Sequence, residues 1–280
     1  MLNIQKLSRK PKTFHSLTGM SPEQFNLLLK RITPFWQEAE LKRKSWQGRV
    51  RKIGGGRRRR LNLEQSLFLL LMYYSTYVNH VFLGMIGGID DSKICKYFAI
   101  LEPVLARVFK IPQREVTLSQ DEILELIVDA TEQETEKRPG SGYSGKKKRQ
   151  TIKTQIHVNP GGKIKAVSKS FSGNVHDKRV YDNSKTVFFI RGNPGKVKKK
   201  GDSGYLGTEC VVPKKNSKLR KLTEKEKLFN HILASERVIV EHVISFLKKF
   251  HILKDRFRNK LSRYNLIFKN ICGIRNFITA

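Results

Sequence analysis

The stretch that decides the fold of this chain is residues 124–132, with the sequence LELIVDATE. Four of its first five residues are apolar, and the run is closed by Asp129. A short continuous apolar run is typical of a buried β-strand. We therefore predict a buried strand that delivers the carboxylate of Asp129 at its end. The alternative is an aspartate that only forms a turn or a cap.

Downstream of this strand the sequence has a mixed α/β pattern. Residues 151–158 alternate in polarity and are followed by Asn159-Pro160-Gly161-Gly162, which predicts a hairpin with a second strand from Lys163. Further elements are expected as a helix at about 176–184, a strand within 186–200, and long helices over 222–253 and 261–277. We predict an α/β domain over roughly 113–280.

Upstream of it the pattern is helical. Ser21-Pro22-Glu23-Gln24 is a capping-box sequence with proline at the first helical position, which predicts a helix over about 22–32. A loop or hinge is expected over 42–60, where Gly54, Gly55 and Gly56 interrupt a basic segment.

Three apolar stripes follow this hinge and predict three further helices. They are Leu63 to Tyr74, then Phe82, Met85 and Ile86, and then Ile94 to Val108. The tight turn over 87–92 between the last two gives a helix-turn-helix layout. We predict an α-helical DNA-binding domain over roughly 1–112.

The charge of the chain points to a polyanionic partner. Its 280 residues contain 56 Lys and Arg against 24 Asp and Glu, a net charge of +32. Such self-repulsion is offset when nucleic acid is bound. A membrane is not expected, because the longest apolar run, 67–74, is far shorter than the roughly 18 residues of a spanning helix.

Nothing in the N-terminal residues has the pattern of a secretion signal, so we expect a soluble protein of the cytoplasm, associated with the nucleoid. The three cysteines, Cys95, Cys210 and Cys272, are far apart in the sequence and form no CxxC pair, so they give no sign of a zinc site.

Two more acids are candidates to act with Asp129. Asp202 lies in Gly201-Asp202-Ser203-Gly204-Tyr205, and Glu241 lies in a helical segment over 235–243. Carboxylates are the ligands that Mg²⁺ prefers, and a pair of ions about 4 Å apart can activate the attacking oxygen and stabilise the leaving oxygen at a phosphodiester. Taken singly, the Asp202 segment could be an ordinary turn and Glu241 a solvated helix residue.

Helix geometry favours Glu241 over its neighbour Glu236. At about 100° per residue, Arg237, Glu241 and Lys248 fall within roughly 40° of one another, on the border of the apolar arc. That arc is formed by Val240, Val243, Ile244 and Leu247. Glu236 is expected to point into the arc, and it remains the alternative third acid if the helix begins later.

Basic clusters supply candidate phosphate contacts. They are Arg57 to Arg60, then Lys146, Lys147, Lys148 and Arg149, then Lys198 to Lys200, and finally the lysines and arginine of 214–221. A single cluster is usually a solvated face, but four of them with little acid favour DNA contact.

The second helix of the helix-turn-helix, about 91–105, is expected to enter the major groove. Ser92, Lys93 and Lys96 are then candidates for contact with bases or phosphates, although they could equally be surface positions. His176 and Asp177 suggest metal or acid–base chemistry in support of the main site. A cap at the start of a helix is the alternative for this pair.

The ordered segments DATEQ, YSGKKKRQTIKTQ, GNVHDKRVYD, GDSGYLG and SERVIVEHVISFLKKF resemble those of bacterial insertion-sequence transposases of the DDE superfamily, a group similar to Harbinger-type elements. The resemblance extends from about residue 20 to the C-terminus, because GGRRRRLNLEQSLFLLLMYYSTY and LGMIGGIDDSKICKYF resemble that group's helix-turn-helix.

The resemblance implies a ribonuclease H-like fold and two Mg²⁺ or Mn²⁺ ions held by Asp129, Asp202 and Glu241. It also implies double-stranded DNA as the partner, at element ends and at the target, with phosphodiester hydrolysis followed by strand transfer. Such transposases commonly act as dimers or larger assemblies on DNA, so a homo-oligomer is compatible with this interpretation.

The family pattern Tyr-x2-Arg-x3-Glu-x6-Lys is matched by Arg237, Glu241 and Lys248, which would steady phosphate or orient the acid. Ala234 stands where that pattern has tyrosine.

A second departure is the approach to Asp202, Lys196-Val197-Lys198-Lys199-Lys200, which is too basic for a buried central strand. It predicts a short or edge strand, or a copy that has lost activity. Two other functions are therefore weighed: a catalytically inactive transposase that only binds DNA, and a basic RNA-binding protein. All three acids stand in place, which favours the enzyme, and no aromatic RNA-recognition motif is present in the sequence.

Overall fold

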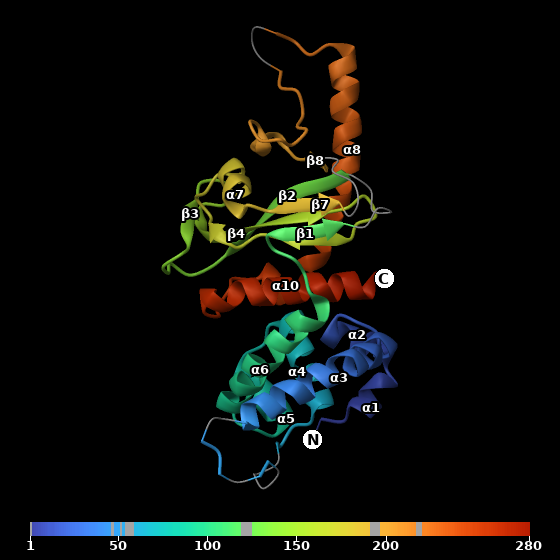
Figure 1. Cartoon of the computed structure of the whole chain (residues 1–280), viewed down its shortest axis with the longest axis vertical. Helices are drawn as coiled ribbons and strands as arrows, with labels where there is room; N and C mark the ends of the chain where they lie inside the picture. Colours follow the sequence, from blue (N-terminus) through green and yellow to red (C-terminus); the bar gives the residue numbers. More distant parts are fainter. Residues whose placement is uncertain are drawn as a thin grey trace. The chain divides into compact units, whose positions relative to one another are not determined.

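The computed structural model describes residues 2–45, 48–50, 52–53, 59–118, 125–190, 197–216 and 220–280. The chain folds into two compact units (Figure 1). The first comprises Met1–Lys110, Lys249–Lys254 and Leu266–Ala280, and the second comprises Ile111–Lys248 and Asp255–Asn265. Several residues that carried predictions lie outside the described ones: Gly54 to Gly56, Arg57, Arg58, Leu124, Lys196 and Lys218.

The first unit is helical in the part of the chain that the structure describes. Its helices are α1 (Ile4–Ser8), α2 (Pro11–Thr18), α3 (Pro22–Lys44), α4 (Leu63–Thr76), α5 (His80–Gly87), α6 (Asp91–Phe109) and α9 (His251–Lys254), together with the later part of α10 (Leu261–Ile278).

The capping box predicted for α3 is confirmed. Ser21 and Gln24 exchange side-chain to backbone hydrogen bonds of 3.2 and 3.0 Å. The helix continues to Lys44 instead of ending near residue 32, and its later half is anchored by the buried side chain of Trp36. The predicted end was therefore wrong, because Trp36 is the one buried residue after Ile32 in this helix, and one buried residue gives no apolar periodicity.

The core of the first unit forms around α4, in which ten consecutive residues from Ser66 to Ser75 are buried. Phe68 of this helix meets Phe14 and Phe25 edge to face, at centroid distances of 5.5 and 6.3 Å. Aromatic rings of this kind contribute a large share of the apolar area buried in a core. Because α4 is buried on all sides, apolar residues occur on every side of this helix.

The face of α5 was predicted wrongly. Phe82 and Met85 of the expected apolar stripe are 39% and 71% exposed. The buried face consists of Leu83, Gly84 and Gly87. A Cβ at Gly84 would stand 2.5 Å from the carbonyl oxygen of Ile89, so the closely packed side of this helix carries two glycines beside Leu83 and not Phe82 or Met85.

The stripe predicted for α6 is confirmed, since Ile94, Leu101 and Leu105 are fully buried. With α5 and the turn that ends at Asp90, α6 completes the helix-turn-helix layout.

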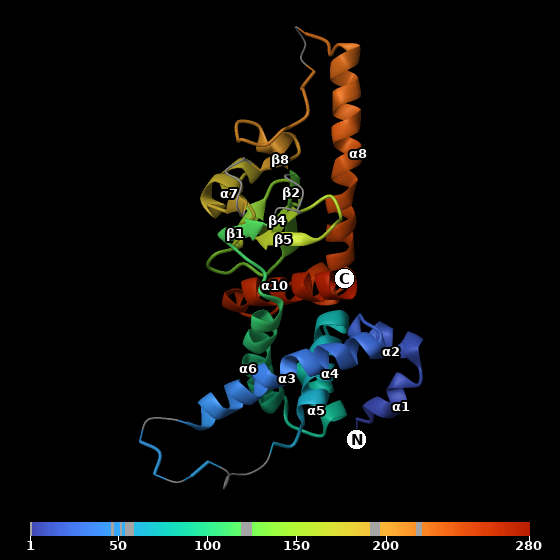
Figure 2. The ribbon, with the colours of Figure 1, turned by 45° about the vertical axis from the view of Figure 1, so that its right-hand side comes forward.

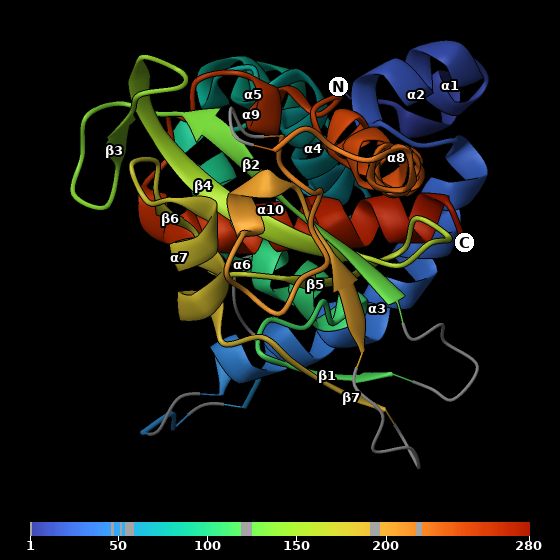
Figure 3. The same cartoon turned by 90° about the horizontal axis from the view of Figure 1, so that it is seen from above.

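The second unit contains a six-stranded sheet whose main path runs β3 (Gly142–Ser144), β4 (Arg149–Val158), β2 (Glu125–Glu134) and β8 (Lys198–Lys200). Two short strands, β5 (Ile164–Val167) and β6 (Phe171–Ser172), also pair with β4. Strand β2 is antiparallel to β4 and parallel to β8 (Figure 3). The predicted hairpin of β4 and β5 is confirmed.

Other elements of this unit surround the sheet. Strands β1 (Glu115–Leu118) and β7 (Val187–Ile190) form a separate parallel pair. Helix α7 (Asp177–Ser184) and the short η1 (Ser203–Tyr205) are neighbours, and α8 (Glu224–Leu247) packs against β2 (Figure 2). The described residues therefore form a mixed α/β unit accompanied by a helical one, which confirms the predicted class at that level.

Strand β2 does not end at Asp129, as was predicted, but continues to Glu134. Its second half alternates in burial, with Thr131 and Gln133 buried, and all of it pairs with β4. The strand continues through these polar residues because β4 pairs with it and satisfies its backbone groups. The long helix predicted over 222–253 is likewise interrupted, because α8 ends at Leu247 and α9 begins at His251.

The basic strand before Asp202 is both short and at the edge of the sheet, which confirms one of the predicted alternatives. Strand β8 has three residues and only β2 beside it on the main path. Lys199 and Lys200 are nonetheless buried. Each is neutralised by acid: Lys199 pairs with Glu209, and Lys200 pairs with Glu125 at 2.7 Å and Glu236 at 2.8 Å.

Among the helices of the described residues, none is both long and apolar enough to cross a bilayer.

Candidate active site

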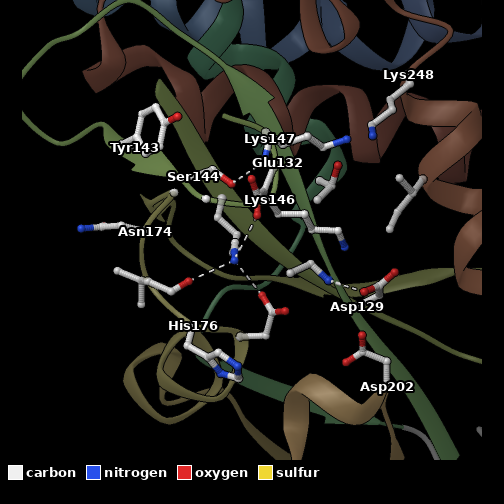
Figure 4. Close-up of a pocket in the computed structure, with 18 of the residues that line it drawn as sticks. Asp129, Glu132, Tyr143, Ser144, Lys146, Lys147, Asn174, His176, Asp202 and Lys248 are labelled. Carbon is white, nitrogen blue, oxygen red and sulfur yellow. Dashed lines mark hydrogen bonds and ion pairs between the residues drawn. The ribbon is translucent and has the colours of Figure 1, made fainter. Parts of the chain in front are cut away.

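The second unit contains a cavity of about 760 Å³ with acidic and basic side chains in its wall (Figure 4). Its carboxylates belong to Asp129, Glu132, Asp177, Asp202 and Glu241, and its ammonium groups to Lys146, Lys147, Lys153 and Lys248. Residues separated by more than a hundred positions in the sequence thus face one space.

Asp129 and Asp202 reach this space from neighbouring strands. In the parallel register of β2 and β8, Ile127 stands opposite Lys200. Asp129 and Asp202 each follow these paired residues by two positions, so the equal offset places both aspartates at the same end of the pair. Figure 4 shows the side chains of Asp129 and Asp202 next to each other on one side of the cavity.

The carboxylate of Asp129 is held in a low-dielectric, negatively charged setting. Burial raises the pKa of Asp129 to about 6, and the charges of Asp202 and Asp177 also raise it, while a hydrogen bond from the Ala130 N–H and the charge of Arg237 act in the opposite direction. The hydrogen bond from Ala130 is 2.8 Å long. Concentrated negative charge of this kind favours a bound cation.

Asp202 is fixed by the turn that follows β8. It is the N-cap of η1, and its Oδ1 accepts a hydrogen bond of 2.8 Å from the N–H of Gly204. The turn that was considered as an alternative for Asp202 is therefore present. Asp202 also lines the cavity.

Glu241 lies on the exposed side of α8, where it lines the cavity with Ser245 and Lys248. The adjoining side of the helix is buried through Val240, Val243 and Leu247, so Glu241 lies at the border of the apolar arc, as the helix geometry predicted.

Glu236 lies on the side of α8 that carries buried Leu233 and Val240, as the helix geometry predicted. Its side chain is 38% exposed and forms an ion pair of 2.8 Å with Lys200, which draws it toward β8. Glu236 is not among the residues that line the cavity.

Of the cations predicted to contact phosphate, some line the cavity and others do not. Lys146, Lys147 and Lys248 line the cavity, and burial lowers the pKa of Lys248, as does the charge of Lys147. Arg237 acts on the site through its charge, which lowers the pKa of Asp129. Lys148 and Arg149 are not in the cavity wall.

Lys148 occupies a left-handed turn position at φ 52°, and Arg149 pairs with Glu134 at 2.6 Å. Lys93 and Lys96 belong to the first unit, where they are exposed near the start of α6. Lys93 forms an ion pair of 2.9 Å with Asp90.

Of the two functions weighed for His176 and Asp177, the capping alternative is confirmed for His176. Nδ1 of His176 accepts a hydrogen bond of 3.3 Å from the N–H of Lys178 and so caps α7. Asp177 forms an ion pair of 2.9 Å with Lys153. Both residues line the cavity, and Figure 4 shows His176 there.

The polar residues of the wall that were missed from the sequence include Glu132, Ser144 and Lys153. Burial alone would raise the pKa of Glu132, but hydrogen bonds from Ser144 and Lys153 lower it. The strand register provides the missing signal, since Glu132 stands opposite Lys153 on β4. Pairing of strands cannot be read from one strand alone.

The donor set of the wall suits a hard divalent cation. It offers carboxylate oxygens and no thiol, and like-charge repulsion between Asp129 and Asp202 would be relieved by such an ion. Among the described residues, no three His, Cys, Asp or Glu side chains are close enough together to hold one ion. Glu241 and the two aspartates thus share the cavity, but as they stand they do not form a closed set of ligands.

Taken together, a helix-turn-helix layout and a cavity of carboxylates bordered by lysines define a class of DNA-processing nuclease. Comparison with known families agrees: residues 128–276 match the family described as DDE superfamily endonuclease, and residues 59–111 match its helix-turn-helix. The chain belongs to the DDE superfamily endonucleases, which confirms the resemblance drawn from its motifs.

One similar protein is a probable transposase for insertion sequence element IS702 from Microchaete diplosiphon. It is 28% identical over 280 residues, an alignment that covers 96% of this chain and 95% of the relative. No solved structure matches the chain.

Proposed function

We propose that this protein is a transposase that binds double-stranded DNA at the ends of its element, hydrolyses phosphodiester bonds there and transfers the freed strands to target DNA. The observation that carries the proposal is the placement of Asp129 and Asp202 at matched positions of two parallel strands, with Glu241 in the wall of the same cavity. The similarity to a probable insertion-sequence transposase over nearly the whole chain supports it.

In this proposal Asp129, Asp202 and Glu241 bind two Mg²⁺ or Mn²⁺ ions. The ions, when bound, supply activation of the attacking oxygen and stabilisation of the leaving one. Because Glu241 comes from a helix, while Asp129 lies on a strand of the sheet and Asp202 follows one, a small approach of α8 would complete the set of ligands. A ribonuclease H-like fold is part of the proposal, and it is supported by the order of antiparallel β4, central β2 and parallel β8.

The cations bring the phosphodiester to this acidic wall. Lys146, Lys147 and Lys248 contact the phosphates beside the scissile bond, and Lys148 and Arg149 contact the strand farther along the same loop. Arg237 steadies phosphate or orients the carboxylate of Asp129, whose charge it already influences. Without such cations, carboxylates would repel the DNA backbone.

DNA is held by the helical part of the chain, with α6 in the major groove and Lys93 and Lys96 near bases or phosphates. We assign residues 1–112 to a DNA-binding domain and 113–280 to a catalytic domain, with the later part of α10 belonging to the first compact unit. The protein would act in the bacterial cytoplasm at the nucleoid, as a homo-oligomer on paired ends.

An inactive transposase that only binds DNA is not favoured, because such a protein has no need to keep three acids in the wall of one cavity. The test is incubation of the purified protein with element-end DNA and Mg²⁺, in parallel with Asp129→Asn and Glu241→Gln.

Glu236→Gln is the matched control, since this acid lies on the same helix but outside the cavity wall. We expect cleavage by the wild type and the control only. Equal behaviour of all four proteins would remove the catalytic proposal.

A further inference from the structure

Lys153 is a buried cation at the centre of the cavity wall. It lies on β4 with 7% of its surface exposed. Its Nζ stands 3.2 Å from Oε1 of Glu132 and 2.9 Å from Oδ1 of Asp177, and it donates a hydrogen bond of 3.0 Å to the carbonyl oxygen of Val175. Figure 4 shows Glu132 in this network (dashed lines). One ammonium group thus joins β2, β4 and the start of α7.

Asp177 connects this network to Asp202 and Asp129, two of the proposed catalytic acids. A Cβ built on Gly204 would lie 2.9 Å from Oδ1 of Asp202 and 3.0 Å from Oδ2 of Asp177, so both carboxylates approach the same glycine. Asp177 also adds to the negative charge felt by Asp129. The position of Asp177 therefore affects the setting of both aspartates.

Lys153 remains charged despite its burial. Burial alone would lower the pKa of Lys153, but interactions with Asp177 and Glu132 raise it above its ordinary value. Replacing a buried ion network by apolar groups is often neutral or stabilising, so stability alone gives little reason to keep a lysine here. Its place in the cavity wall points to a function in the site.

We propose that Lys153 is a positioning residue of this active site. Its ammonium group fixes Glu132 and the segment before α7, so that Asp177 stands beside Asp202 in the geometry that cleavage requires. Lys153 itself does not contact DNA, because its side chain is 8% exposed. The inference rests on the proposed nuclease function and adds a residue to it.

Lys153→Met, Lys153→Arg, Asp177→Asn and the double variant Lys153→Met/Asp177→Asn test this function, with Lys165→Met as control. Lys165 is also a buried lysine of this sheet, on β5 and outside the cavity wall. Two quantities are measured: single-turnover cleavage of element-end DNA, with its binding constant, and hydrogen exchange of the amides over 173–178.

We expect Lys153→Met to slow cleavage by about 10- to 100-fold, the range expected when reacting groups are displaced by roughly 1 Å. DNA binding should stay within about twofold, since no interaction made in the ground state is removed. Exchange over 173–178 should increase in Lys153→Met and not in Lys165→Met. Lys153→Arg should regain most of the rate, because it keeps the charge.

The double variant should cleave about as slowly as the slower single variant, because both changes remove one interaction. Additive losses, unchanged exchange over 173–178, or unchanged cleavage by Lys153→Met would each overturn the inference while wild-type activity stands. If Lys153→Met does not fold, the inference is tested by measuring cleavage and hydrogen exchange over 173–178 in Lys153→Arg and Asp177→Asn. A wild type that fails to cleave overturns the proposed function itself.

Discussion

Asp129 and Asp202 occupy matched positions after two paired residues of neighbouring parallel strands, although 73 positions separate them in the sequence. Each lies two residues beyond a pair of opposed residues, Ile127 on β2 and Lys200 on β8. Because the two strands are parallel, equal offsets bring the two side chains to the same place on the sheet. A shift of one residue in this register would point one aspartate to the other face.

The first prediction concerns chemistry at this pair. Asp129→Asn keeps the shape of the side chain and removes its charge, so it should abolish cleavage while leaving DNA binding intact. A loss of roughly three orders of magnitude or more in the single-turnover rate is expected for a member of a catalytic unit. Single-turnover cleavage and a gel-shift titration on the same DNA measure the two effects. Equal loss of binding would mean that Asp129 acts in folding rather than in catalysis.

A second prediction concerns pH and stability. The folded-state pKa of Asp129 is raised from 3.8 to about 6, so the folded protein binds this proton more tightly than the unfolded chain does. The stability associated with this proton is fully present below the unfolded pKa and is lost as pH rises from 3.8 through 6. Metal-free Asp129→Asn should therefore melt higher than the wild type at pH 7.5.

The gain should disappear near pH 3.5, where Asp129 is protonated in both states. Each 1 kcal/mol corresponds to a shift in Tm of about 2–4 °C for a unit of this size. Thermal melts in EDTA at the two pH values measure the difference. A gain of the same size at both would show that charge on Asp129 is not its cause.

Much of the site could be predicted from the sequence because its parts are local. The helix geometry of α8 places Glu241 at the border of the apolar arc of Val240, Val243 and Leu247 with no reference to the rest of the chain. The turn at Asp202 can also be predicted from the sequence, because its hydrogen bond joins Asp202 to Gly204, two residues away. Both residues line the cavity.

The errors come from interactions between distant segments. The ion pair of Glu236 was not predicted, because its partner, Lys200, lies on another element. Strand β2 continues past Asp129 because β4 pairs with it, and the face of α5 is decided by how closely Gly84 approaches Ile89. Lys153 was overlooked for the same reason, since the partners that neutralise it come from β2 and α7.

A third prediction concerns DNA binding. Affinity dominated by phosphate contacts should fall steeply between about 50 and 200 mM salt. Lys93→Ala and Lys96→Ala should each weaken binding and reduce the salt slope by roughly one if they neutralise a phosphate. Lys12→Ala, at an exposed position of α2, is the control and should leave the slope unchanged. Unchanged slopes for both α6 variants would move the DNA contact away from the start of this helix.

The last prediction concerns the glycine between two carboxylates. A Cβ at Gly204 would lie 2.9 Å from Oδ1 of Asp202 and 3.0 Å from Oδ2 of Asp177, so Gly204→Ala has to displace one of these groups. Cleavage should slow by about 10-fold or more, because catalytic groups tolerate little displacement. Gly145→Ala is the matched control, since Gly145 also lines the cavity but a Cβ there meets nothing within 4 Å. Circular dichroism would establish that both variants fold, and equal cleavage by both would show that the carboxylate positions beside Gly204 do not limit the reaction.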